Sequence, residues 1–167
     1  ILAFSAVVRE FGDLSDYIKL NKVKIIKFDN LSRNQTLLNS IKATSSGLSF
    51  FSETFIKIKP HLVLLMADRY EVISAAIAAS YLNIKIIHFQ GGELSGNIDG
   101  KVRHSISNLS DYHFVCTKKA KHFLAKRNFF KNVFLTGCPS IDLMSEVKKK
   151  STHNISIIKK NMRVKKN

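Results

Sequence analysis

Cysteine, proline, tryptophan and acidic residues are all scarce in this 167-residue sequence, which has two cysteines, two prolines and no tryptophan. The two cysteines, Cys116 and Cys138, cannot build a disulfide framework and lack the spacing of metal ligands. We therefore expect no metal site and a reducing, cytoplasmic location. Seven glycines beside 45% hydrophobic residues exclude collagen-like and low-complexity chains, so most of the chain is expected to fold.

Long hydrophobic runs are also lacking. The nearest candidate, residues 72–82, is shorter than the roughly 20 residues that cross a bilayer, so no membrane span is expected. The chain opens with Ile1 inside an apolar run and has no basic segment followed by a cleavage site. This start is unlike a signal peptide, and we expect the natural beginning of the protein to be missing.

The shortage of acids leaves a strongly basic chain, with 27 Lys and Arg against 12 Asp and Glu and a net charge of +15. Residues 147–167 hold eight of the basic residues and no acid, which leaves a net charge of +7 on residues 1–146. We expect 147–167 to be a disordered basic tail and do not expect nucleic acid as a partner. The alternative is a non-enzymatic fragment that binds polyanions through this tail.

Short β-branched runs alternate with helical patterns along the rest of the chain. Strands are expected at 1–8, 23–28, 62–66, 84–89, 112–116 and 132–136, and helices at 34–58, 70–82, 100–110, 117–127 and 140–147. Several strands are apolar almost throughout, as strands buried on both faces are. The alternation predicts an α/β fold, a doubly wound parallel sheet with right-handed crossovers.

The longest expected helix, 34–58, carries an apolar stripe at spacings of three, four and seven residues that should face the core. Its members are Leu37, Ile41, Leu48, Phe51, Phe55 and Ile58, and Pro60 ends the helix.

Ligands of such sheets bind beyond the carboxyl ends of the strands, so the loops after 66, 89, 116 and 136 are the ones to consider. We expect the first two loops to carry the functional side chains and the last two loops to carry none. Asp68 follows the strand 62–66, and Asp99 precedes the helix 100–110. Either acid could act in proton transfer or could simply cap its helix by accepting from free amides.

The loop after residue 89 combines flexibility with charge. Gly91 and Gly92 let the backbone approach a ligand, and Glu93 lies six residues before Asp99. Arg103 and His104 follow on the next helix, where an anion such as phosphate would be favoured, although Arg103 could instead pair with Asp99. No dinucleotide or P-loop motif is present, no cofactor is expected, and Cys138 in its Gly-Cys-Pro turn is expected to be inert.

Three segments resemble the UDP-N-acetylglucosamine 2-epimerases, in particular the hydrolysing branch of sialic and legionaminic acid pathways. They are PHLVLLMADRYEVISAAIAASYLNI (60–84), HFQGGELSGNIDGKVRHSISNLSDYHFVCT (88–117) and FLTGCPSIDLM (134–144). The resemblance implies two Rossmann-like domains facing a cleft, as in one large glycosyltransferase class. Residues 1–146 then correspond to most of the first domain without its first strand.

The family resemblance also implies an activity, namely conversion of UDP-GlcNAc or a diacetamido relative to the free 2-epimeric sugar plus UDP. Asp68 and Asp99 match acid/base groups, with Glu93 as a third catalytic carboxylate. Gln90 stands where some members have a catalytic Glu, and we interpret it as substrate-orienting. Arg103 matches a cleft-facing arginine, and His104, Gly91 and Gly92 complete the expected substrate-binding set.

A non-hydrolysing epimerase that returns UDP-N-acetylmannosamine is the alternative within the same fold. Full-length relatives are expected to be homo-oligomers. The 167 residues alone are expected to be a truncated, catalytically silent fragment, because a cleft enzyme obtains much of its rate from holding substrate between two walls.

Overall fold

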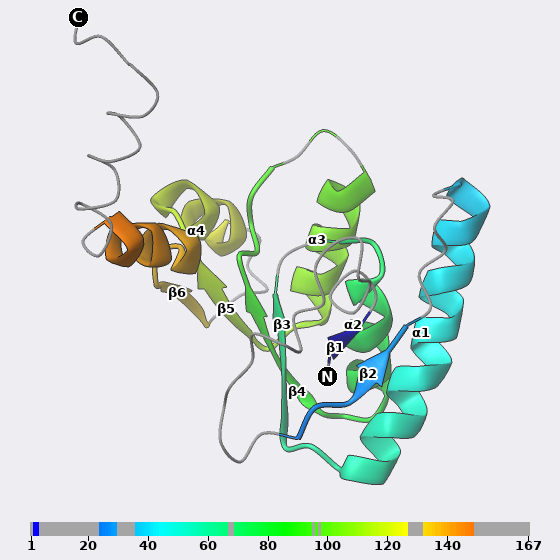
Figure 1. The fold of residues 1–167 in the computed structure, drawn as a ribbon. Coiled ribbons are helices and arrows are strands. Elements are labelled where there is room, and N and C mark those ends of the chain that lie inside the picture. Colours follow the sequence, from blue (N-terminus) through cyan, green and yellow to red (C-terminus); the bar gives the residue numbers. More distant parts are fainter. Residues whose placement is uncertain are drawn as a thin grey trace, which may run out of the picture.

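The structure is a computed structural model that describes residues 2–3, 24–29, 36–66, 69–94, 96, 98–126 and 132–148 (Figure 1). The strands are β1 Leu2–Ala3, β2 Lys27–Phe28, β3 Leu62–Met66, β4 Lys85–Phe89, β5 Tyr112–Val115 and β6 Val133–Leu135. The helices are α1 Leu37–Ile58, α2 Val72–Tyr81, α3 Ile98–Leu109 and α4 Lys118–Ala125, followed by a further helix over 139–148. Each lies within a few residues of an expected element, or inside one.

All strand pairs are parallel, which confirms the predicted α/β class. Strands β3-β4-β5-β6 form one sheet in that order, and β1 and β2 form a separate pair. Because the four-stranded sheet grows in one direction along the chain, right-handed crossovers place α2, α3 and α4 on the same face. The main core lies between that face and the helices, with Ile86 and Ile106 fully buried in it.

The expectation that the strands are buried on both faces was wrong for the residues described. In β3, Val63 and Leu65 are buried, whereas Leu62, Leu64 and Met66 are exposed. The cause is the one-directional strand order, which directs the crossover helices of β3 to β6 to a single face. An apolar run therefore predicted the strand correctly but not how many of its faces are covered.

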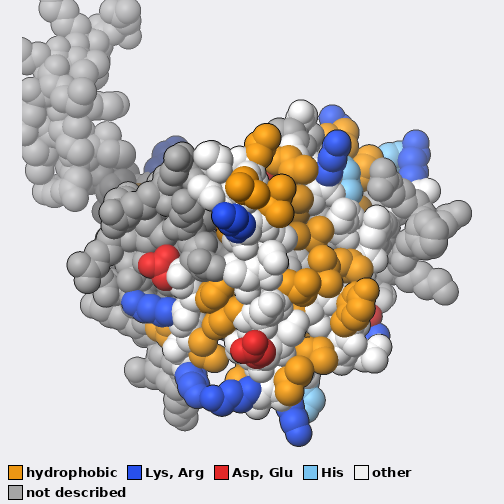
Figure 2. All heavy atoms as spheres, turned by 90° about the vertical axis from the view of Figure 1, so that its right-hand side faces the viewer, with side chains coloured by type: hydrophobic (Ala, Val, Ile, Leu, Met, Phe, Trp, Pro, Cys, Tyr) orange, Lys and Arg blue, Asp and Glu red, His pale blue; other side chains and the backbone are white. Residues whose placement is uncertain are grey.

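The apolar stripe predicted for α1 was also partly wrong. Phe51 and Phe55 are buried, but Leu37 and Ile41 are 88% and 66% exposed and Ile58 is exposed as well. The helix instead buries a row at spacings of four that consists of Ala43, Gly47, Phe51 and Phe55. Figure 2 shows hydrophobic side chains, in orange, at the surface on the α1 side of the molecule.

The ends of α1 follow from local chemistry. The Thr36 side chain accepts a hydrogen bond from Asn39 N at 3.2 Å and so caps the first turn. Lys59 takes a left-handed conformation at the other end, with φ 47°, and Pro60 follows. Its N–H donates to Phe55 O at 2.8 Å, which satisfies one of the last carbonyls of the helix.

None of the helices in the described ranges is long and apolar enough to cross a membrane.

Two histidines lie deep in the sheet, on its buried face. His88 in β4 pairs in register with His113 in β5, and both are almost fully buried. The ring Nδ1 of His88 lies 3.0 Å from Ser107 Oγ of α3, which joins the sheet to that helix.

We predict that the free energy of unfolding falls by on the order of 2–3 kcal/mol between pH 6.5 and pH 4 because of His113. Burial, and then the charge of His88, lowers the pKa of His113 to about 4 from an ordinary 6.5, against a smaller opposite effect of Asp111. Over this range the unfolded state binds more protons, so the stabilisation is complete above pH 6.5 and is lost as the pH falls through 4. Urea unfolding at several pH values measures the slope.

His113→Phe, which keeps a buried ring that does not titrate, should flatten that slope. The matched control is His61→Phe, because His61 is exposed and its replacement should leave the slope unchanged. An unchanged pH dependence in His113→Phe would assign the loss of stability to other groups.

Candidate active site

The residues selected from the sequence gather at the carboxyl ends of β3, β4, β5 and β6, as parallel topology requires. Gln90, Gly91, Gly92 and Glu93 follow β4 directly. Asp99 lies in the first turn of α3. Asp68 lies outside the described residues, so its predicted role stays a prediction.

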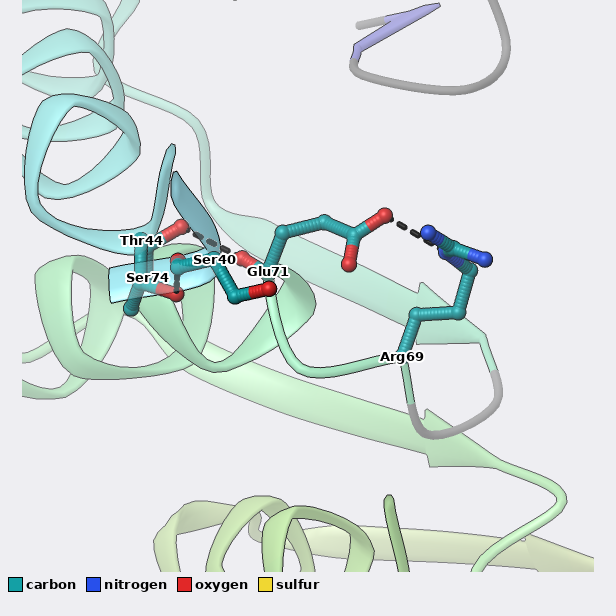
Figure 3. A network of polar contacts seen from close by, with 5 residues as sticks. All are labelled: Ser40, Thr44, Arg69, Glu71 and Ser74. Carbon is teal, nitrogen blue, oxygen red and sulfur yellow. Dashed lines mark hydrogen bonds and ion pairs between the residues drawn. The ribbon is translucent and has the colours of Figure 1, made fainter. Parts of the chain in front are cut away.

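The loop after β3 is organised by an ion pair between Arg69 and Glu71 (Figure 3). Arg69 Nε donates to Glu71 Oε1 at 2.6 Å, and the two side chains point toward each other. Glu71 is only 2% exposed, and Ser74 Oγ donates to its backbone carbonyl at 2.6 Å at the start of α2. The buried carboxylate thus holds the guanidinium of Arg69 in place at the sheet edge.

Arg69 also connects the two loops that the sequence singled out. Burial by itself would lower the pKa of Arg69, but the hydrogen bond to Glu71 and the charges of Glu71, Tyr70 and Asp99 raise it overall. The Asp99 carboxylate is therefore near enough to Arg69 for their charges to interact.

Arg103 fixes the loop after β4 onto α3. Its Nη1 donates to the backbone carbonyl of Glu93 at 2.8 Å. The carboxylate of Glu93 in turn accepts from Thr117 Oγ1 at 2.8 Å. Glu93 is thus held from both ends, by α3 through its backbone and by the loop after β5 through its side chain.

Thr117 has a second role as the cap of α4, because its Oγ1 accepts from Ala120 N at 3.0 Å. A hollow of about 390 Å³ lies beside it, lined by Gly92, Glu93, Leu94, Lys119, His122, Phe123 and Lys126. His104 of α3 packs on Phe123 of α4, with ring centroids 5.0 Å apart. The predicted contact of His104 with the substrate stays a prediction.

Gln90 takes an unusual backbone conformation, with φ 62° at the end of β4. Left-handed backbone in a residue other than glycine is rare and is concentrated at functional sites. Its N–H donates to Phe114 O at 2.9 Å, and its side-chain Nε2 donates to Cys138 Sγ at 3.8 Å. The side chain is thus directed along the sheet edge toward the loop after β6.

The two glycines after Gln90 are packed tightly. A Cβ on Gly91 would lie 2.8 Å from His88 Nδ1 and 2.9 Å from Ser107 Oγ. A Cβ on Gly92, where φ is 81°, would lie 2.8 Å from Ala120 O. Both glycines therefore serve the packing of the loop, and the contact with a ligand that we predict for them remains a prediction.

Comparison with known proteins decides the family. The family model for UDP-N-acetylglucosamine 2-epimerase matches residues 7–167. The chain belongs to the UDP-N-acetylglucosamine 2-epimerase family.

Relatives of this epimerase-family chain include two hydrolysing enzymes. It is 44% identical over 108 residues to the UDP-N,N'-diacetylbacillosamine 2-epimerase (hydrolyzing) of Legionella pneumophila, which covers 64% of this chain and 29% of that protein. It is 40% identical over 111 residues to the GDP/UDP-N,N'-diacetylbacillosamine 2-epimerase (hydrolyzing) of Campylobacter jejuni, covering 64% and 28%. The chain thus spans less than a third of the length of these curated relatives.

A solved structure agrees with the fold. The crystal structure of UDP-GlcNAc 2-epimerase from Neisseria meningitidis bound to UDP-GlcNAc superposes with a TM-score of 0.67 at 26% identity. The match covers 86% of this chain and 39% of that one. The predicted Rossmann-like parallel fold is therefore confirmed for this family member.

Two loops of this epimerase-family site were underestimated from the sequence. The loops after β5 and β6 were expected to be bland, yet they supply Thr117, which binds Glu93, and Cys138, which binds Gln90. Thr117 could have been found, because a threonine directly before a helical pattern is a typical cap. The neighbours that Thr117 and Cys138 contact across the sheet edge carry no such local signal.

Proposed function

We propose that the full-length protein is a hydrolysing UDP-sugar 2-epimerase, which converts a UDP-2-acetamido sugar to the free 2-epimeric sugar and UDP. The observation that carries the proposal is the convergence of two loops at one sheet edge, where Arg69 interacts with Asp99 and Arg103 fixes Glu93. The 44% and 40% identical relatives named as hydrolysing enzymes support the hydrolysing outcome over the non-hydrolysing one.

The chemistry needs a base for the proton on C2, departure of UDP to give a glycal, and addition of water to that glycal. Carboxylates can supply and remove these protons when they are positioned within hydrogen-bond distance of the substrate. In our proposal Asp68 and Asp99 act as the acid/base pair, and Glu93 is the third carboxylate. Asp99 is assigned to this role because it follows the substrate-facing loop and lies near the Arg69 cation.

Other side chains of the site bind rather than transfer protons. Gln90 cannot exchange a proton as a carboxylate does, so we assign its amide to orienting the substrate. Arg103 and His104 are assigned to substrate binding, as are the backbone amides of Gly91 and Gly92. UDP-GlcNAc and a diacetamido UDP-sugar are the two substrate candidates that the family resemblance implies, and the names of the two hydrolysing relatives favour the second. A cytoplasmic location, predicted from the scarcity of cysteine, belongs to the same proposal.

Product analysis tests the proposal. We suggest a chimera in which the matched 108-residue segment of the Legionella pneumophila relative is replaced by the segment of this chain. Incubated with UDP-GlcNAc and, separately, with a diacetamido UDP-sugar, it should release UDP and a free 2-epimeric sugar, separable by ion-exchange chromatography. The unmodified relative is the positive control, and the 167-residue chain alone should release no UDP above background.

An intact epimeric nucleotide sugar as the product would reverse the assignment in favour of a non-hydrolysing epimerase. The polyanion-binding alternative instead requires strongly salt-dependent binding of nucleic acid by the 167-residue chain that disappears when residues 147–167 are deleted.

A further inference from the structure

The only two cysteines of the chain, 22 positions apart in the sequence, meet at the sheet edge. Cys116 directly follows β5, and Cys138 lies three residues after the end of β6. Thr136 N donates to Val115 O at 3.0 Å, which continues the pairing of these two strands up to the cysteines. The two thiols lie close enough for each to affect the pKa of the other.

The two thiols have different surroundings. Cys138 directly precedes the helix 139–148, and the Ile141 N–H donates to its backbone carbonyl at 3.0 Å. The nearby backbone amides of Ile141 and Ser140 lower the pKa of the Cys138 thiol. Burial, together with the neighbouring Cys138, raises the pKa of Cys116 to about 11. Both side chains are nevertheless partly exposed, so a small solute can reach them.

We propose that Cys116 and Cys138 form a redox-active dithiol that a hydroperoxide oxidises to an intrachain disulfide. Nothing in the epimerase chemistry uses this pair. The register of β5 and β6 sets Cys116 opposite Thr136, two residues before Cys138, so the two cysteines lie beyond the ends of neighbouring strands. In a reducing compartment such a pair rests as two thiols and closes transiently.

The reaction balances in two steps. The Cys138 thiolate attacks one oxygen of the hydroperoxide, so an S–O bond forms, the O–O bond breaks and an alcohol leaves, or water when the oxidant is hydrogen peroxide. The Cys116 sulfur then attacks the sulfenic sulfur of Cys138. An S–S bond forms, the S–O bond breaks, and the departing hydroxide takes the Cys116 proton to give water. Two thiols are oxidised and one hydroperoxide is reduced.

The pair is connected to the candidate active site through Gln90, whose Nε2 donates to Cys138 Sγ. Closure of the disulfide replaces a thiol or thiolate acceptor by a neutral disulfide sulfur, which is a weaker acceptor. Any effect on substrate binding rests on the proposed function, whereas oxidation of the pair does not.

The test treats the native 167-residue chain with hydrogen peroxide, then alkylates remaining thiols with a maleimide polymer and reads the mass shift on a gel. The reduced chain should add two polymers and the oxidised monomer should add none. Dithiothreitol should restore both thiols, so that two polymers are added again. Because the chain has only these two cysteines, a protected monomer identifies the intrachain bond. Oxidation in concentrated urea should be at least tenfold slower, since the fold no longer brings the two thiols together.

Serine variants separate the roles of the two cysteines. In Cys116→Ser, oxidation should stop at a sulfenic acid on Cys138 that dimedone traps, and in Cys138→Ser the loss of the remaining thiol should be at least tenfold slower. Circular dichroism shows whether each variant is folded, and the urea comparison on the wild-type chain does not depend on them. Disulfides formed only between chains, or an equal rate in native and unfolded protein, would overturn the proposal.

Discussion

Asp99→Asn in the chimera carrying this segment is expected to reduce UDP release by a factor on the order of 10². An amide has nearly the shape of the carboxylate but cannot take up or deliver a proton at the sugar. The structure places Asp99 in the first turn of α3 and within electrostatic range of Arg69. Initial rates of UDP formation with saturating UDP-sugar measure the effect.

A matched control makes the same chemical change at the opposite edge of the sheet. Asp111 precedes β5 and pairs with Lys85 Nζ at 2.7 Å, far along the strands from the candidate site. Asp111→Asn should change the rate by less than about twofold, since exposed ion pairs contribute little to stability and none of its contacts reaches the loops after β3 and β4. Near-normal turnover in Asp99→Asn would remove Asp99 from the acid/base assignment.

Glu93→Gln distinguishes a catalytic carboxylate from a structural one. Thr117 Oγ1 can still donate to the amide oxygen of a glutamine, so the loop should keep its position. A fall in kcat comparable to that of Asp99→Asn would show that the charge or proton of Glu93 takes part in the reaction. An unchanged kcat would leave Glu93 as a residue that joins the loop after β4 to α4.

The order and type of the elements could be predicted from the sequence because they rest on local patterns. Runs such as 62–66 and 84–89, punctuated by alanine-rich and amphipathic segments, are sufficient to indicate a parallel α/β sheet. Which face of α1 is buried could not be predicted. The helix packs through Ala43 and Gly47 because small side chains allow close approach to the alanine-rich α2, and a pattern based on large apolar residues does not register them.

The same limit applies to the site. Topology alone places Gln90, Glu93 and Asp99 at one edge, since carboxyl ends of parallel strands meet there. The Glu93–Thr117 and Gln90–Cys138 contacts join residues 24 and 48 positions apart, and no periodicity or motif reports such pairs. Their existence depends on the register of β4, β5 and β6, which only the folded sheet defines.

Gly92→Ala is expected to lower the free energy of unfolding by about 3 kcal/mol, from two separate causes. With φ at 81°, the backbone of Gly92 is in a region that costs an alanine about 1–2 kcal/mol. The added Cβ would also lie 2.8 Å from Ala120 O and 2.9 Å from Leu124 Cγ of α4. A backbone carbonyl in a helix cannot move aside without cost, so overpacking adds roughly 1–3 kcal/mol.

Two further glycines separate these causes. Gly137 has φ 84°, but a Cβ added there would meet nothing within 4 Å, so Gly137→Ala should show the backbone cost alone, about 1–2 kcal/mol. Gly96 lies in the same loop as Gly92 with open space around it, and Gly96→Ala should change stability by less than about 0.5 kcal/mol. Urea unfolding with an unchanged m value measures all three. If Gly92→Ala were no worse than Gly137→Ala, the contact between the loop after β4 and α4 would be looser than the structure shows, and the position of Glu93 next to it would lose its support.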